Sequence, residues 1–135
     1  MRSANRWVGI VGGAAFVLLG VLSMLAGQGL FGPPETLVFG VLAGNAAQGI
    51  LHVLVGAALA IAGLSRVRAS AVVNGVVGGV LLVLGLAGLF LVGTEANLLA
   101  LSVADNAVHF GAAAVLLAAG LGADRPSAGT PPGGA

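Results

Sequence analysis

The sequence is poor in charge and contains no cysteine, lysine or tyrosine. Of its 135 residues, 7% are charged and 59% are hydrophobic. A soluble domain of this length needs about a quarter of its residues charged to cover its surface, so we expect lipid to surround most of this chain. The lack of cysteine excludes disulfides, thiolate metal sites and cysteine nucleophiles. The net charge of +1 is too small to indicate binding to nucleic acid.

The chain contains four long apolar runs. Because a helix rises 1.5 Å per residue, about 20 apolar residues cross the hydrocarbon core of a membrane. The four runs that meet this length are residues 7–26, 46–64, 71–92 and 103–121. Each is interrupted only by Gly, Ser, Asn, Gln or His, which neighbouring helices can satisfy. The sequence therefore predicts an all-α membrane protein with four transmembrane helices.

The arginines mark one side of the predicted membrane. All five lie in the three segments that four crossings place on the same side, namely Arg2, Arg6, Arg66, Arg68 and Arg125. The two connections on the other side contain no arginine. The positive-inside rule then predicts that both termini are cytoplasmic. We expect a multi-pass protein of the inner (plasma) membrane, with the lipid bilayer as its first partner.

Three segments need separate interpretations. Residues 1–27 could be a cleaved signal peptide, but their apolar run is longer than the usual core of roughly 7–15 residues, so we expect the first span to be retained. Residues 36–43 (TLVFGVLA) are too few to cross a membrane, and we predict an interfacial helix or an extension of the second span. Residues 122–135 are rich in Pro, Gly and Ser, which predicts a disordered cytoplasmic tail after a transmembrane domain at 1–121.

The two halves of the chain resemble each other. Residues 9–13 (GIVGG) match residues 75–79 (GVVGG), and residues 56–64 (GAALAIAGL) match residues 113–121 (AAVLLAAGL). Chance similarity among helices rich in Gly, Ala and Val is the alternative to a true duplication.

A duplication has a definite structural consequence. It predicts two tandem helical hairpins, residues 7–64 and 71–121, which face the same way and are related by a parallel pseudo-twofold axis along the membrane normal. The GxxxG pairs formed by Gly9 with Gly13 and by Gly75 with Gly79 are then expected to be contacts within the bundle.

A polar pattern with the same spacing occurs once in each half, at the start of the second and fourth spans. With one neighbour, the polar cluster comprises Asn45, Gln48, His52, Ser102, Asp105, Asn106 and His109. The spacing of Asn45 and Gln48, and of Ser102 and Asp105, is typical of a capping box, in which each side chain bonds the backbone amide of the other. Asn45 and Ser102 are therefore predicted to begin helices.

His52 and His109 follow one turn later, on the same face as Gln48 and Asp105. Both imidazoles are expected to point into the bundle, at a similar depth of roughly 10 Å. We prefer the interpretation that two neutral histidines hydrogen-bond across helices, to each other or to nearby polar groups, and fix the packing.

The alternatives use the histidines for chemistry. His52 and His109 could bind haem iron axially, although the outer side has no arginine for the haem propionates. A metal site would need further ligands, for which Asp105 and Glu95 are the candidates. Proton transfer could use Asp105 with His109, but we see no polar residue in the sequence that continues the route below the histidines.

The function expected from these features is that of a structural or accessory membrane protein. It would act by helix packing, with copies of itself as a homo-oligomer or with a larger membrane complex. We expect no enzyme activity, no catalytic residue and no cofactor. The first alternative is a haem- or metal-binding redox protein that uses His52 and His109, and the second is a component of a small-solute transporter or channel.

Two motifs carry a family resemblance. Residues 104–109 (ADNAVH) open the last span, and residues 75–88 (GVVGGVLLVLGLAG) lie in the third. Through them the chain resembles an actinobacterial family of small four-helix membrane proteins, domain of unknown function 4383, over about residues 5–121. Residues 48–52 and Gly56 are similar to the family's other histidine motif, except that Gly49 replaces the usual Asn. The resemblance implies the four-helix fold and no particular activity.

Overall fold

The structure, a computed structural model, describes residues 3–27, 29–32 and 37–124. They form four helices, α1 (Ala4–Ala26), α2 (Ala46–Leu64), α3 (Val67–Leu91) and α4 (Val103–Gly122). Each is long and apolar enough to cross a membrane, which confirms the predicted all-α fold and four spans. The starts predicted for α1 and α3 are a few residues late, because hydropathy marks only the apolar part of a helix and misses the first turns that carry Arg6 and Arg68. The predicted tail lies outside the described residues from position 125 onward.

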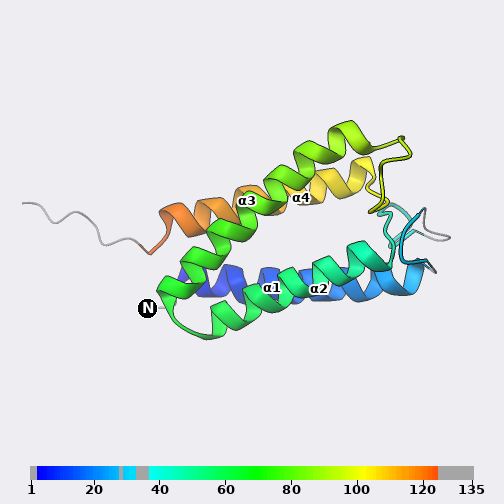
Figure 1. Cartoon of the computed structure of the whole chain (residues 1–135). Coiled ribbons are helices and arrows are strands. Elements are labelled where there is room, and N and C mark those ends of the chain that lie inside the picture. The colour runs from blue at the N-terminus through cyan, green and yellow to red at the C-terminus, as the bar shows by residue number, and fades with distance from the viewer. Residues whose placement is uncertain (1–2, 28, 33–36, 125–135) are drawn as a thin grey trace, which may run out of the picture.

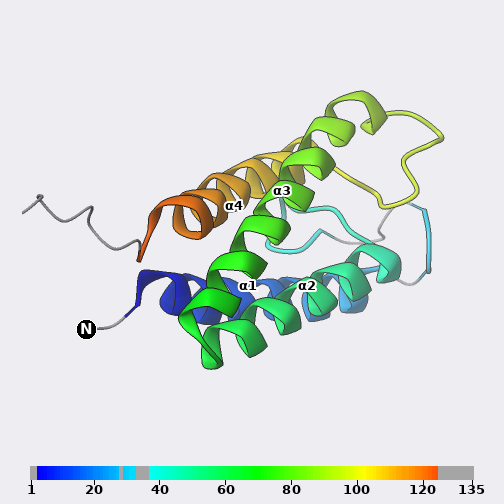
Figure 2. The same cartoon turned by 60° about the vertical axis from the view of Figure 1, so that its left-hand side comes forward.

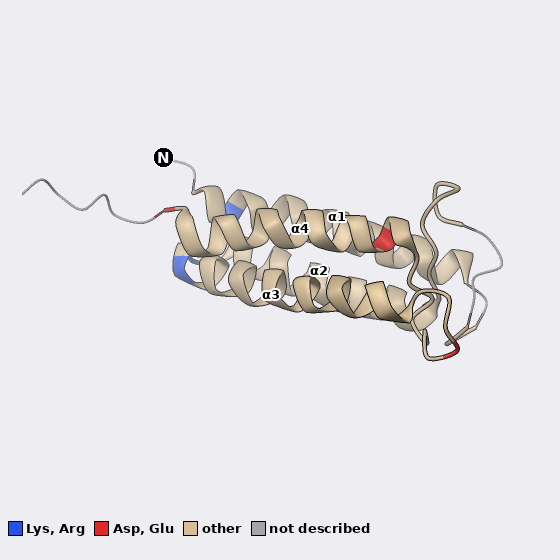
Figure 3. Cartoon of the chain, turned by 90° about the horizontal axis from the view of Figure 1, so that it is seen from above, with Lys and Arg blue, Asp and Glu red and all other residues tan. Residues whose placement is uncertain are grey.

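The helices pair as two hairpins, α1 with α2 and α3 with α4 (Figure 1). The start of α1, the α2–α3 turn and the end of α4 lie at one end of the bundle, which we call the terminal end (Figure 2). The connections after α1 and after α3 lie at the opposite end, which we call the loop end. The arginines of the described chain gather at the terminal end (Figure 3). Many large apolar side chains are exposed on the outside of the helices, as contact with a lipid bilayer requires.

Glycine allows the helices of each hairpin to approach closely. A methyl group on Gly13 would lie 2.7 Å from the Gly56 carbonyl oxygen, and one on Gly56 would lie 2.6 Å from that of Gly13. In the second hairpin, a methyl group on Gly120 would lie 2.5 Å from the Gly75 nitrogen. No side chain fits at these places without moving a helix, which is how small residues act in membrane bundles.

The predicted contact of Gly75 and Gly79 as a GxxxG pair is right for Gly75 and wrong for Gly79. The backbone of Gly75 lies against Gly120, whereas a methyl group on Gly79 would meet no atom within 4 Å. Gly78 takes the place of Gly79, because a methyl group there would lie 2.9 Å from the Leu117 side chain. Gly9 and Gly13 do lie against α2, as predicted.

An apolar cluster fills the middle of the bundle. Its buried members are Phe16, Leu59, Val77, Leu81, Ala113 and Leu116. The buried positions of α1 (5, 9, 13, 16, 20 and 23) recur on α3 with the same spacing at 70, 74, 78, 81, 85 and 88. Both helices thus use the same small and large positions to line the interior.

The helix predicted within residues 36–43 is also wrong for the part that the structure describes. Residues 37–43 form a tight turn, in which Val38 and Leu42 exchange backbone hydrogen bonds of 2.9 and 3.0 Å. Phe39 and Gly40 have φ angles of 53° and 74°, in the left-handed region that a right-handed helix cannot contain. Residue 36 lies outside the described residues.

Candidate functional site

Helix caps position the polar cluster at the loop end. The Asn45 side chain accepts a hydrogen bond of 3.0 Å from the Gln48 backbone nitrogen and begins α2. Ser102 Oγ accepts one of 3.1 Å from the Asp105 nitrogen, and Asp105 Oδ2 accepts one of 2.9 Å from the Ser102 nitrogen. Both predicted caps are confirmed, and the second is a complete capping box.

The first copy of the capping box is incomplete, which corrects the prediction for Gln48. Neither Gln48 Oε1 nor Nε2 has a hydrogen-bond partner within the described part of the chain, although the side chain is buried. A methyl group on Gly44 would lie 2.8 Å from Gln48 Oε1 and 2.9 Å from Ser23 Oγ. Gln48 Oε1 therefore lies close to Gly44 without accepting a hydrogen bond from the Asn45 nitrogen.

His52 and His109 meet across the bundle. Their Nε2 atoms lie 3.3 Å apart, and their rings are inclined edge to face with centroids 5.6 Å apart. His52 is 6% exposed and His109 is fully buried. The contact is made by the side chains alone, because no Cα atom of α2 lies within 8 Å of one of α4.

An apolar side chain packs against one of the two rings. Phe16 packs edge to face on His52, with centroids 5.4 Å apart. Within the described residues, the Nδ1 atoms of both histidines and Asn106 Oδ1 have no hydrogen-bond partner. Of the hydrogen bonds expected for the histidines, only the one between the two rings is formed within the described residues, through both Nε2 atoms. One Nε2 must donate and the other accept, so a neutral pair with complementary tautomers satisfies the contact.

The histidine pair is poorly shaped for axial ligation of haem iron. Nitrogen ligands lie about 2 Å from a metal ion, so two nitrogens on opposite sides of an iron would be about 4 Å apart. Here they are 3.3 Å apart, a separation that suits two ligands of a tetrahedral ion, but such an ion needs further ligands. In the described ranges, no group of three or more His, Asp or Glu side chains is suitable for a metal ion. Asp105 is engaged with Ser102, and Glu95 lies on the loop that follows α3.

The structure adds a second polar cluster at the terminal end, which the sequence did not predict. Ser70 Oγ donates a hydrogen bond of 2.7 Å to the Asn5 carbonyl oxygen. Asn74 Nδ2 donates to the same oxygen at 2.9 Å and to Asn5 Oδ1 at 3.0 Å. All three side chains are fully buried. The apolar cluster separates this polar layer from the histidines, so it does not continue a proton route from them.

Asp124 joins the end of α4 to the start of α1. Its carboxylate accepts hydrogen bonds from Ser3 Oγ at 2.6 Å and from the backbone nitrogens of Ala4 and Asn5 at 3.2 and 3.0 Å. These donors include backbone N–H groups that a helix start leaves unpaired. The bond from Ser3, followed by that from the Asn5 backbone, holds the pKa of Asp124 below its ordinary value of 3.8.

The missed residues gave only a weak local signal. Asn74 interrupts an apolar run, and such an interruption marks a side chain that needs a partner inside the bundle. Asn5 precedes the predicted first span and lies in a short polar segment (residues 2–6) of the kind that flanks a transmembrane helix. Asp124 lies 119 residues from Asn5 along the chain, so no local pattern could connect them.

A family model covers most of the chain. The model described as domain of unknown function 4383 matches residues 6–122, which include all four helices apart from the first two residues of α1. No curated protein and no solved structure matches the chain.

Proposed function

The chain belongs to the family described as domain of unknown function 4383, and within it we propose a structural or accessory membrane protein. Such a protein acts by helix packing, with copies of itself or with a larger membrane complex. The observation that carries the proposal is the use of the buried polar groups. The histidine pair links α2 to α4, and Asn74 links α3 to α1, so both join one hairpin to the other.

We also propose that the two hairpins are tandem copies related by a pseudo-twofold axis. Buried positions on α1 and α3 correspond with a shift of 65 residues, one less than the shift of 66 between the GIVGG and GVVGG motifs, and those on α2 and α4 correspond with a shift of 57. With these shifts, His52 corresponds to His109 and Asn5 to Ser70. Each of these pairs is in direct contact. Equivalent residues touch each other only at a twofold axis, which supports an axis through both polar layers.

The orientation that we propose places the terminal end in the cytoplasm. The described arginines Arg6, Arg66 and Arg68 all lie there, whereas Glu95 lies in the connection at the loop end. Cytoplasmic segments carry the excess of arginine in multi-pass proteins. Trp7 lies close to the same end, at the level where indole rings mark a membrane interface.

One observation favours a second candidate, a metal-binding or redox protein. Two imidazole Nε2 atoms converge in a buried place, as they would around a shared ion. Their separation of 3.3 Å is too short for two axial ligands of one iron, and no third His, Asp or Glu ligand for another metal accompanies them in the described residues. Transport has less support, because the apolar cluster lies between the two polar layers.

Visible absorption spectra and metal analysis separate the two candidates. The protein is purified in mild detergent from a haem-competent host, together with His52→Ala and His109→Ala variants. We expect a featureless spectrum, no stoichiometric metal, and co-purification of a discrete oligomer or membrane complex. A Soret band or a bound metal that both variants lose would overturn the proposal. A protein that stays monomeric and without partners in native membranes would also contradict it.

A further inference from the structure

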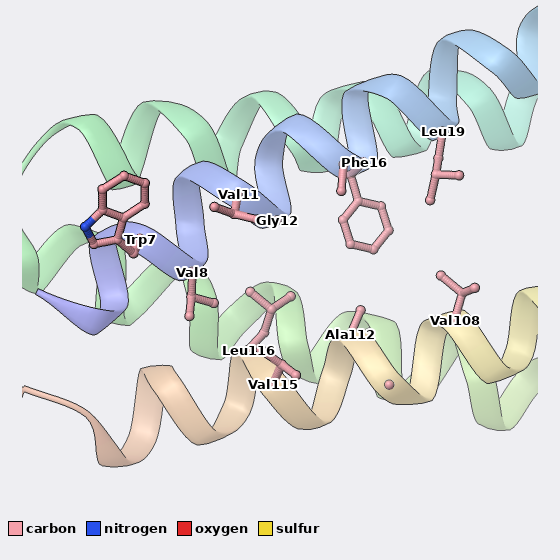
Figure 4. Close-up of a pocket in the computed structure, with 12 residues that line it drawn as sticks. Trp7, Val8, Val11, Gly12, Phe16, Leu19, Val108, Ala112, Val115 and Leu116 are labelled. Carbon is pink, nitrogen blue, oxygen red and sulfur yellow. The ribbon is translucent and has the colours of Figure 1, made fainter.

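The two hairpins are loosely joined at the level of the histidines. A groove of about 540 Å³ runs between α1 and α4, and side chains of the two helices face each other across it (Figure 4). Its lining includes Phe16, which packs on His52, and Val108, which precedes His109. A second groove of about 270 Å³ lies between α2 and α3, with His52 in its lining. The contact between the two imidazoles therefore joins the hairpins between two incompletely filled seams.

Other hydrogen bonds between the hairpins lie at the ends of the bundle. At the terminal end, Ser70 and Asn74 of α3 donate to Asn5 of α1. At the loop end, Asn45 Nδ2 donates a hydrogen bond of 2.8 Å to the Leu98 carbonyl oxygen, but Leu98 lies on the connection after α3 and not on a helix. Loss of the histidine contact would therefore let α2 and α4 separate at the loop end while the terminal end stays joined.

The histidine contact depends on how many protons the pair holds. In the neutral pair, one Nε2 donates a hydrogen bond to the other. If both rings are protonated, both Nε2 atoms are donors, so the bond is lost and two positive charges face each other across 3.3 Å. A single added proton keeps the bond, but it places a charge in a buried site where neither Nδ1 atom has a partner among the described residues. Rings that separate and meet water avoid both penalties.

Few charged side chains of the described helices lie near the pair. On α4, Asp105 precedes His109 by one turn, and its carboxylate is engaged in the capping box. Arg6 and Arg68 lie in the first turns of α1 and α3, at the terminal end, and α2 contains no Arg, Asp or Glu. Glu95 lies on the connection after α3. At this depth the histidines are the groups whose charge ordinarily changes near neutral pH.

The loop end gives the shorter route for protons to the pair. His52 follows Asn45, which begins α2, by seven residues, or about 10 Å at the rise of an α-helix. On the other side, the apolar cluster lies between the pair and the terminal end. In the orientation proposed above, the loop end faces the outside of the cell.

From this geometry we propose that His52 and His109 form an acid-sensitive switch between the two hairpins. In the joined state, the hydrogen bond between the neutral rings links α2 to α4. In the separated state, acid on the loop side has protonated both rings, and the hairpins have moved apart at the loop end but not at the terminal end. This inference deepens the proposed function, since it rests on the histidine pair as a link between the hairpins.

Distances within one chain test the switch. The sequence lacks cysteine, so spin labels can be attached at Ile50→Cys with Val103→Cys at the loop end, or at Leu64→Cys with Leu121→Cys at the terminal end. All four side chains are exposed. The labelled protein is placed in lipid nanodiscs, and pulsed EPR is recorded from about pH 8 to about pH 5, the range in which histidine ordinarily titrates. We expect a second, longer loop-end distance to appear as the pH falls, and a constant terminal-end distance.

The pH dependence measures the protons taken up. The separated state binds up to two more protons than the joined state, so lower pH favours it, by up to about a hundredfold for each pH unit. The double variant His52→Leu with His109→Leu should lose this dependence. If it does not fold, His52→Gln with His109→Gln supplies amides that do not titrate. Asp124→Asn is the control and should respond like the unmodified chain, because Asp124 lies at the terminal end and its pKa is below 3.8.

Three outcomes would overturn the proposal. They are a loop-end distance that does not change with pH, a response that persists without both histidines, and a response that Asp105→Asn abolishes. The last outcome would assign the acid response to the capping box of α4. A pH-independent distance would leave the proposed packing function standing. A protein without partners would contradict that function and leave the switch intact, because both distances lie within one chain.

Discussion

The contact between His52 and His109 allows a quantitative test of the packing role. The test is a double-mutant cycle of His52→Leu, His109→Leu and the double variant. Each single variant leaves one buried imidazole without its partner, and we expect it to lower the free energy of unfolding by about 1–3 kcal/mol. The double variant removes both polar rings, so its loss should be smaller than the sum of the two single losses.

The difference between that sum and the double loss is the coupling energy. Hydrogen bonds between membrane helices contribute about 0.6 kcal/mol on average and up to about 1.7 kcal/mol. The Nε2 separation of 3.3 Å is at the long end of the range of hydrogen-bond lengths, which lowers the expected coupling energy. However, neither ring has another hydrogen-bond partner in the described residues, which raises it. We therefore expect a coupling of about 1 kcal/mol, or roughly fivefold in the unfolding equilibrium.

Reversible unfolding in mixed detergent micelles supplies the free energies. A control cycle that combines His52→Leu with Asn74→Leu should be additive, because Asn74 belongs to the polar cluster at the terminal end. Independent sites add within about 0.3–0.5 kcal/mol. A histidine–histidine coupling no larger than that scatter would refute the view that this contact links the hairpins. So would a coupling that appears only when metal is added.

Three further changes test the helix contacts and caps. Gly56→Ala should lower the free energy of unfolding by about 1–3 kcal/mol, because its methyl group would lie 2.6 Å from the Gly13 carbonyl oxygen. In the control Gly79→Ala, the methyl group has no atom within 4 Å, and unfolding curves should show no loss of this free energy. Ser102→Ala removes the cap of α4, and calorimetry should show a loss of about 1 kcal/mol. The pKa of Asp124 is lowered by folding, so its contribution to stability is present above pH 3.8 and is lost as the pH falls through the lower, folded value. Thermal unfolding measured against pH should therefore show an acid loss that is smaller in Asp124→Asn.

Local signals in the sequence were sufficient to predict the four helices and the residues that cap α2 and α4. The bounds predicted for α2, residues 46–64, are those of the structure, because Asn45 supplies a cap at one end and charged residues follow at the other. The turn at Phe39 and Gly40 was missed, since an apolar segment carries no sign of which residue will adopt a positive φ. Hydropathy alone cannot separate such a turn from a short helix.

The candidate site was only partly predictable from sequence. The spacing of each histidine from its helix cap placed both imidazoles at the same depth, where the structure shows them in contact. The partners at the terminal end could not be found in this way, because Asn74 and Asn5 come from different hairpins. The prediction of which α3 glycines pack against α4 was only partly right, for a related reason. Gly79 completes the motif with Gly75 and Gly78 does not, yet it is Gly78 that packs against Leu117.

The carboxylate of Asp124 has a consequence for the connectivity of the chain. Because it bonds the backbone of Ala4 and Asn5, the two ends of the bundle-forming segment meet, and its path is nearly a closed ring. A ring can be opened elsewhere. A circular permutant that begins at Arg66, with a short linker from Asp124 to Ser3, keeps both hairpins whole and reverses only their order in translation. If the hairpins are equivalent building blocks, the bundle should tolerate either one being made first.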